Sequence, residues 1–124
     1  MNTRKKVLVC DDDVPILLTL SFIVRQEGYE LITAEDGEEG LRLARTELPD
    51  LILLDVTMPK KCGFDVCREI KAGKATEKPY VIMLTARGRD ADVEEGYRSG
   101  ADDVMKKPYS PKDLCRRLHE LLDT

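Results

Sequence analysis

Short, mostly apolar segments alternate with amphipathic segments along the whole chain. The apolar segments are typical of buried strands, and they lie at 6–10, 30–33, 51–54, 80–84 and 103–106. The segments between them repeat apolar residues every three or four positions, as a helix does when one of its faces is buried. Because strands and helices alternate, we expect an α/β fold with a doubly wound parallel sheet, covered by helices on both faces.

Five amphipathic helices are predicted to flank this sheet. Their apolar positions are Ile16, Leu17, Leu20, Ile23 and Val24; Leu41, Ala44 and Leu48; Cys67 and Ile70; Val93 and Tyr97; and Leu114, Leu118, Leu121 and Leu122. Asp36 with Glu39 three residues later, and Ser110 followed by Pro111, are typical helix starts. Helix ends are expected at the glycines that follow three of these segments, Gly28, Gly73 and Gly100.

The length of the chain suits one domain with a single core, so we expect residues 1–124 to form one domain. Charged residues make up 35% of the chain, with both signs interspersed and a net charge of −4, and no basic patch indicates that it binds nucleic acid by itself. No apolar run approaches the roughly 20 residues that span a bilayer, and MNTRKK leads into a strand without a signal sequence. We therefore expect a cytoplasmic protein without a membrane segment.

The cysteines and the single histidine do not indicate a metal site. Cys10, Cys62, Cys67 and Cys115 form no CxxC pair and lack the spacing of zinc ligands. We expect them to be reduced and to serve as small apolar residues. His119 lies among leucines near the end of the last predicted helix, which favours a surface or packing role over catalysis.

Polar side chains follow four of the predicted strands at the point where each strand ends. Asp11 and Asp12 follow the first, Asp55 the third and Thr85 the fourth, while Lys107 lies just after the fifth. The carboxyl ends of parallel strands share one edge of the sheet, where open α/β folds bind their ligands. We therefore expect these residues to meet in one crevice.

The acids at this edge should attract a cation. Asp13 is read as a turn and capping acid, because such residues are common where a strand leads into a helix. Asp11 and Asp55 come from different strands, and two carboxylates about 6 Å apart repel by roughly 3 kcal/mol at an effective dielectric near 20. Oxygen-only ligands suit Mg²⁺, with Lys107 as a second positive charge. A carboxylate, a metal, a lysine and the Thr85 hydroxyl together suit phosphoryl transfer.

On these residues the chain resembles the response-regulator receiver domains of bacterial two-component signalling. The resemblance covers the whole chain through VLVCDDD, LILLDVTMPKKCGFD, VIMLTA, GADD and KKPYSP, in the same order and spacing. It implies a flavodoxin-like sheet of five parallel strands in the order 2-1-3-4-5 with five flanking helices. It also implies a switch that is controlled by phosphorylation, not an enzyme that turns over an external substrate.

The resemblance implies roles for the residues around the acceptor. Asp55 would be the phosphoacceptor, Asp12 a direct Mg²⁺ ligand, Asp11 a ligand mainly through water, and the backbone carbonyl of Thr57 the last protein ligand. Met58, Pro59 and Gly63 would shape the loop beside the acceptor, and Pro108 would follow a cis peptide bond. Ala86, which is small, would leave the phosphoryl site open to a donor.

Thr85 and Lys107 would respond to the phosphoryl group, Thr85 as the switch hydroxyl that turns toward it and Lys107 as the lysine that pairs with it. The implied phosphodonor is the phosphohistidine of a sensor histidine kinase or of a phosphotransfer protein. The implied output is a covalent effector domain beyond residue 124 or a separate downstream protein.

Three other classes of protein fit this sequence less well. A phosphohydrolase of the haloacid-dehalogenase type needs a second carboxylate two residues after its nucleophile, where this chain has Thr57. A flavodoxin-like nucleotide or flavin carrier would need a glycine-rich phosphate loop after the first strand, where three acids stand instead. A metal-free pseudo-receiver is excluded because all five site residues are present.

The last third of the chain is similar to receivers of the winged-helix transcription-factor subfamily, whose active forms pair through salt bridges. Asp103, Asp113 and Arg117 match charged positions of that network. Val93 stands where an arginine is usual, and Val104 stands where most receivers carry an aromatic ring that moves with the switch threonine. We therefore expect weak or phosphorylation-dependent self-association and a modest change of this surface.

The residues two positions after Asp55 and Thr85 flank the path of the water that removes the phosphoryl group in this family. Here they are Thr57 and Arg87, and neither carries a carboxylate or an amide that could orient that water. Arg87 could also pair with the phosphoryl group. We expect slow loss of the phosphoryl group.

Overall fold

Five parallel strands form one sheet in the order β2-β1-β3-β4-β5. The computed structural model of the chain describes residues 4–73, 78–86 and 90–123. The strands are β1 (Lys6–Cys10), β2 (Glu30–Ala34), β3 (Leu51–Asp55), β4 (Tyr80–Thr85) and β5 (Asp103–Lys106). The predicted strand order and the doubly wound α/β fold are confirmed.

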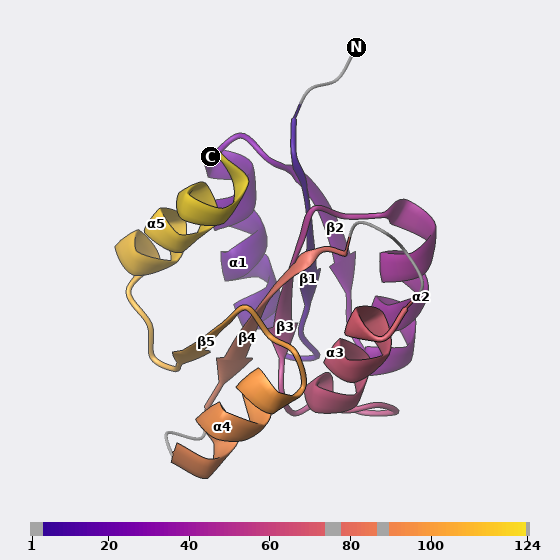
Figure 1. Cartoon of the computed structure of the whole chain (residues 1–124). Coiled ribbons are helices and arrows are strands. Elements are labelled where there is room, and N and C mark those ends of the chain that lie inside the picture. The colour runs from indigo at the N-terminus through magenta and orange to yellow at the C-terminus, as the bar shows by residue number, and fades with distance from the viewer. Residues whose placement is uncertain (1–3, 74–77, 87–89, 124) are drawn as a thin grey trace.

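Helices cover both faces of the sheet, as Figure 1 shows. They are α1 (Val14–Gln26), α2 (Gly37–Glu47), α3 (Gly63–Lys71), α4 (Asp90–Arg98) and α5 (Pro111–Leu122). Helices α1 and α5 pack on one face, and α2, α3 and α4 pack on the other. The sheet is therefore the middle of three layers.

Three strands extend one residue beyond the predicted ends. β2 includes Ala34, β3 includes Asp55 and β4 includes Thr85. The prediction stopped each strand at or near its last strongly apolar residue, whereas the hydrogen-bonded pairing continues, with Asp55 opposite Leu84. As a result, the proposed acceptor and the threonine are held by the sheet itself.

The helix starts agree with the sequence pattern. Side-chain oxygens of Asp13, Asp36 and Ser110 accept the backbone N–H groups of Ile16, Glu39 and Asp113 at the first turns of α1, α2 and α5. These contacts satisfy N–H groups that have no partner inside a helix. The interpretation of Asp13 as a capping acid is thereby confirmed.

Leu48 does not belong to the apolar stripe of α2, where the pattern had placed it. Helix α2 ends at Glu47, and Leu48 is 73% exposed with a left-handed backbone, at φ 49°. Pro49 follows, and a proline pushes the residue before it away from right-handed helical geometry. The apolar spacing therefore continued one residue beyond the helix.

Strand β3 is the centre of both hydrophobic clusters. Leu51 and Leu53 pack in the cluster beneath α1 and α5, while Ile52 and Leu54 pack in the cluster beneath α2, α3 and α4. All four side chains have no exposed surface. Because β3 is buried on both faces, it is a rigid support for the residue at its end, Asp55.

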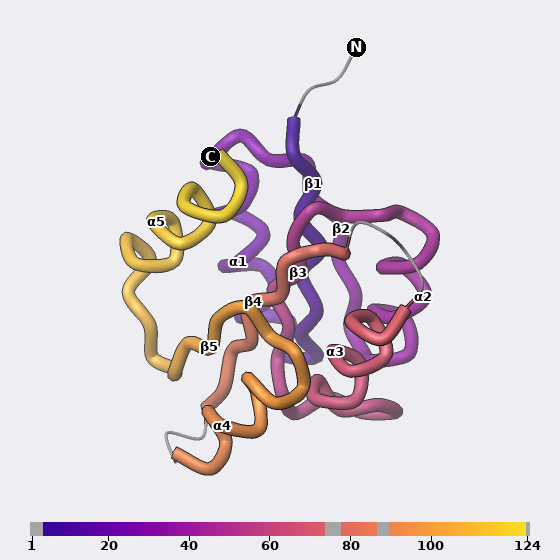
Figure 2. The backbone as a smooth tube through the Cα atoms, in the orientation of Figure 1, coloured from indigo at the N-terminus to yellow at the C-terminus, as the bar shows by residue number. Residues whose placement is uncertain are grey.

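The chain runs along each strand in one direction and returns through the following helix (Figure 2), so the two edges of the sheet differ. We call the edge where strands end the carboxyl edge and the other the amino edge. At the amino edge, Asp50 accepts the N–H of Lys6 and Asp102 accepts the N–H of Val81, both at 2.8 Å. Within the described ranges, no helix has the length and apolar character that crossing a bilayer requires.

Candidate phosphoryl site at the carboxyl edge

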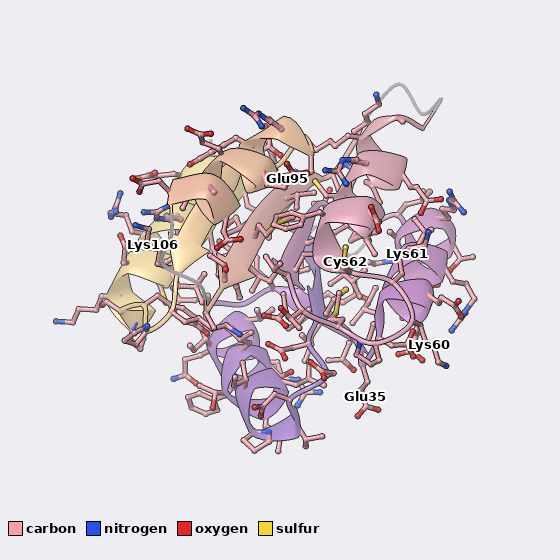
Figure 3. The ribbon with its side chains drawn as sticks, turned by 90° about the horizontal axis from the view of Figure 1, so that it is seen from below. Glu35, Lys60, Lys61, Cys62, Glu95 and Lys106 are labelled. Atoms are coloured by element: carbon pink, nitrogen blue, oxygen red, sulfur yellow. The ribbon has the colours of Figure 1, made fainter. Side chains whose placement is uncertain are left out.

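The residues predicted to form a site do meet at the carboxyl edge of the sheet. Asp55 and Thr85 end β3 and β4, and Asp11 and Asp12 directly follow β1. Carboxylate oxygens of Asp11, Asp12 and Asp55 all lie within 4.8 Å of one another, and the described residues contain no second group of this kind. Figure 3 looks onto this edge of the molecule.

Backbone hydrogen bonds carry the sheet pairing into the loops of the site. The N–H of Asp11 donates to the Ala34 carbonyl at 3.1 Å, and the N–H of Lys107 donates to the Thr85 carbonyl at 2.7 Å. The peptide bond between Lys107 and Pro108 is cis, as the resemblance implied. These hydrogen bonds therefore fix the backbone positions from which the side chains of Asp11 and Lys107 extend into the site.

Lys107 bridges two of the carboxylates. Its ammonium nitrogen Nζ lies 2.9 Å from Asp55 Oδ1 and 3.4 Å from Asp11 Oδ2. The Asp11 side chain is 2% exposed, that of Asp55 11% and that of Lys107 17%. In such partly desolvated surroundings, charges interact more strongly than they do on an open surface.

The site changes the acidity of both partners. Burial raises the pKa of the Asp55 carboxyl, and the nearby Asp11 and Asp12 raise it further against the opposing effect of the Lys107 hydrogen bond. Burial alone would lower the pKa of the Lys107 ammonium, but its contacts with Asp55 and Asp11 raise that pKa above its usual value. Lys107 therefore stays protonated, and an additional positive charge would further stabilise the ionised form of the acids around it.

The donor atoms of this cluster fit Mg²⁺. Asp12 is exposed, so it can reach a metal that also contacts the buried Asp11 and Asp55. All three donors are carboxylate oxygens, which hard cations such as Mg²⁺ prefer. Thr57, whose carbonyl the resemblance adds to this set, lies two residues after Asp55 in an exposed position of the β3–α3 loop.

Thr85 and Ala86 lie beside the acceptor strand in contrasting surroundings. Thr85 is 1% exposed, and the next residue, Ala86, is exposed. A small exposed residue at this place leaves room above the carboxylates. Arg87, which the sequence interpretation placed over the phosphoryl group, lies outside the described residues.

The β3–α3 loop packs closely against the acceptor. The N–H of Gly63 donates to the Val56 carbonyl at 2.8 Å, and a Cβ atom at Gly63 would lie 2.3 Å from the Asp55 carbonyl oxygen. Only glycine allows this approach. Met58 is buried in the cluster that includes α2 and α3, which supports the structural role expected for this loop.

The sequence interpretation missed an apolar surface beside Lys107. A groove of about 440 Å³ lies between α1 and the start of α5, and it is lined by Ile16, Thr19, Ile23, Lys107, Pro108, Tyr109 and Pro111. On α1, Val14, Leu18 and Phe22 are large apolar residues with 48%, 65% and 66% exposure. Their spacing of four residues, which places them on one face of a helix, is readable in the sequence.

Comparison with known proteins identifies the family. Residues 7–119 match the model of the response regulator receiver domain. The alkaline phosphatase synthesis transcriptional regulatory protein PhoP of Bacillus subtilis (strain 168) is 43% identical over 119 residues, which cover 96% of this chain and 49% of PhoP. The chain thus spans about half the length of the curated relatives that it matches.

Solved structures share the fold. A CheY-like response regulator receiver domain protein from Methanospirillum hungatei JF-1 matches with a TM-score of 0.88 and 32% identity, over 98% of this chain and 95% of that one. DrrB of Thermotoga maritima, described as an OmpR/PhoB homologue, matches with a TM-score of 0.85 and 33% identity, over 98% of this chain and 54% of DrrB. The chain therefore belongs to the response regulator receiver domains, the phosphorylation-controlled switches of two-component signalling.

Proposed function

We propose that Asp55 is the phosphoacceptor of this receiver and takes its phosphoryl group from a phosphohistidine. The observation that supports this most directly is the bridge from Lys107 to Asp55 and Asp11 within a cluster of three carboxylates. Asp55 ends the central strand, which is buried on both faces, so its carboxylate is fixed before a donor arrives. Preorganised charge of this kind is the main protein contribution to phosphoryl transfer.

In the transfer step, a carboxylate oxygen of Asp55 forms the new bond to phosphorus while the bond from phosphorus to the imidazole nitrogen breaks. The electron pair of the broken bond stays on that nitrogen. Asp11, Asp12, Asp55 and the Thr57 carbonyl would hold Mg²⁺, which when bound supplies positive charge to the phosphoryl oxygens. Lys107 would move its hydrogen bonds onto the phosphoryl group, and Thr85 would donate its hydroxyl hydrogen to it.

The donor would be a sensor histidine kinase or a phosphotransfer protein that docks on α1. The exposed stripe of Val14, Leu18 and Phe22 and the neighbouring groove form an apolar surface beside Lys107. An apolar surface beside a reactive group is typical of a protein–protein contact. Since a kinase of this type depends on ATP, we place the exchange in the cytoplasm.

The relatives named as transcriptional regulators support a proposal for the output. In a full-length protein, an effector domain would follow residue 124, and a separate downstream protein is the other possibility. No direct contact of this domain with nucleic acid is required in either arrangement.

The domain would also assist the loss of its own phosphoryl group, in which water attacks phosphorus and releases phosphate and free Asp55. Neither Thr57 nor Arg87 carries a carboxylate or an amide that could orient this water. We expect the phosphorylated form to last minutes or longer, as measured by the decay of radiolabelled protein in excess Mg²⁺. Loss of the label within seconds would contradict this expectation.

Replacing Asp55 tests the proposed acceptor. The parent chain should gain one phosphoryl group from acetyl phosphate and Mg²⁺, whereas Asp55→Ala should gain none, because the other carboxylate in contact with Lys107, that of Asp11, lies farther from Nζ and is only 2% exposed. Intact-mass spectrometry measures both. Stoichiometric phosphorylation of Asp55→Ala would show that the acceptor is another residue.

A further inference from the structure

The loop that follows the acceptor rests on the first turn of α2. The N–H of Gly37, the first residue of α2, points to the Pro59 carbonyl at 3.4 Å, and Asp36 Oδ2 lies 3.6 Å from Lys60 Nζ. Figure 3 shows Lys60 and Lys61 beside α2 at the carboxyl edge. Thus a donor that a helix start normally leaves without a backbone partner is satisfied by the β3–α3 loop.

Gly37 is the position where this contact tolerates no side chain. A Cβ atom there would lie 1.9 Å from the Lys61 carbonyl oxygen and 2.7 Å from the Lys61 carbonyl carbon. Both are backbone atoms, so a flexible side chain cannot relieve the clash. The backbone of the loop is itself constrained, because Lys60 has a positive φ of 70°.

If the contact is disturbed, the loop should move rather than the helix. Helix α2 is fixed by buried Leu41 and Ala44 and by the close approach of Gly40 to Cys10. By contrast, Pro59 and Lys60 of the loop are exposed to solvent. A displacement of these residues would pass along the main chain to Thr57, two residues before Pro59.

We propose that Gly37 is a positioning residue of the phosphoryl site, which seats the β3–α3 loop so that the Thr57 carbonyl faces the metal. This inference rests on the proposed function, in which Thr57 is a metal ligand. It makes the first turn of α2 a part of the site, although none of its residues would touch the metal or the phosphoryl group.

The test is Mg²⁺ binding to the whole chain, measured by calorimetry. We expect Gly37→Ala to weaken Mg²⁺ binding by about 10- to 100-fold, as the loss of an outer supporting contact typically does. Its rate of phosphorylation by acetyl phosphate should recover at saturating Mg²⁺. Its metal-free circular dichroism spectrum should match that of the parent chain, because saturating Mg²⁺ would also stabilise a partly unfolded variant. The matched control is Gly40→Ala on the same helix, where the added Cβ would lie 2.8 Å from the Cys10 sulfur instead of the loop.

A second measurement uses the parent chain, so it does not depend on how the variant folds. Amide hydrogen exchange by NMR should show that Mg²⁺ slows exchange at Gly37 and leaves Gly40 unchanged. Equal weakening in both variants, parental binding by Gly37→Ala, or unchanged exchange at Gly37 would overturn the inference. A parent chain that does not bind Mg²⁺ would instead contradict the proposed function.

Discussion

Asp11 and Asp12 are neighbours in the chain, but they lie in different surroundings. Asp11 is buried, accepts the N–H of Asp13 at 2.9 Å and contacts Lys107. Asp12 is exposed, although its carboxylate remains within the cluster. The buried acid is therefore held by contacts within the protein and suits a metal contact through water, while the exposed acid is available to bind a cation directly.

We predict that Asp12→Ala lowers Mg²⁺ affinity while the metal-free protein becomes more stable or stays level. The variant loses a ligand, and it also loses carboxylate repulsion of roughly 3 kcal/mol per pair at an effective dielectric near 20, less after screening by solvent. Calorimetric Mg²⁺ titration and urea unfolding without metal measure the two effects.

Asp13→Ala is the matched control for this prediction. It removes the N-cap of α1, which should cost about 1 kcal/mol of stability without changing Mg²⁺ affinity. If Asp12→Ala binds Mg²⁺ as tightly as the parent chain, Asp12 is not a ligand.

At the scale of elements, a histidine ties the end of α5 to the end of α1. His119 Nε2 lies 2.6 Å from Glu27 Oε1, and Nδ1 lies 3.0 Å from the Tyr29 hydroxyl and also contacts Asp123. The hydrogen bonds to Asp123 and Glu27 raise the pKa of the His119 imidazole above its usual value of 6.5. The structural role expected for this residue agrees with these contacts.

This cluster predicts a pH dependence of stability. Because the pKa of His119 is raised by folding, its contribution is fully present below about pH 6.5 and is lost as the pH rises through the folded value. We expect urea midpoints of the parent chain and of His119→Gln to differ most at mildly acidic pH and to converge toward alkaline pH. A difference that grows with rising pH would contradict the assignment.

The elements also show what periodicity could and could not predict. The sequence pattern identified all five strands and the starts of α1, α2 and α5, because burial on both faces of a parallel sheet leaves continuous apolar runs that are followed by polar capping residues. The apolar pattern does not show that hydrogen-bonded pairing extends β3 and β4 by one residue, to Asp55 and Thr85. Nor does it show that α2 ends before Leu48, the residue that precedes Pro49. Such ends depend on backbone geometry, which the apolar spacing does not encode.

The site was predictable for a related reason. In a parallel sheet, topology brings the strand ends to one edge, so the acids that follow β1 and the acid that ends β3 were expected to meet there. Two features depend instead on how loops pack, and no local sequence pattern predicts them. They are the contact of Gly37 with the β3–α3 loop and the groove beside Lys107. Leu18 and Phe22 are an exception, since their helical spacing was readable.

At the scale of the whole molecule, the charged residues expected to pair between copies are already paired within one. Arg117 contacts Asp103, and its Nε lies 3.3 Å from Asp113, which also contacts Arg116. Val104 packs closely beneath α4, where a Cβ atom at Gly96 would lie 2.8 Å from it. The charged residues of this surface are therefore paired within one molecule. Position 104 carries a valine, so no aromatic ring there can change its orientation on phosphorylation.

We predict that phosphorylation produces at most weak self-association through α4 and α5. Exposed ion pairs contribute only about 0–1 kcal/mol each, so exchanging internal pairs for intermolecular ones gains little. Sedimentation with and without beryllofluoride measures this, with Asp55→Ala as the control that should not respond. A tight dimer that forms only on activation would show that the charge network suffices without an arginine at position 93.

The two unlike edges of the sheet have an evolutionary consequence. Every residue proposed for phosphoryl chemistry lies at the carboxyl edge, whereas Leu48, Asp50 and Asp102 belong to connections at the amino edge. Mutations at the amino edge can alter the robustness of the scaffold without altering the chemistry, and mutations at the carboxyl edge can retune signalling on an unchanged scaffold. Lineages that share this fold can therefore diverge in signalling and in heat tolerance along separate sets of positions.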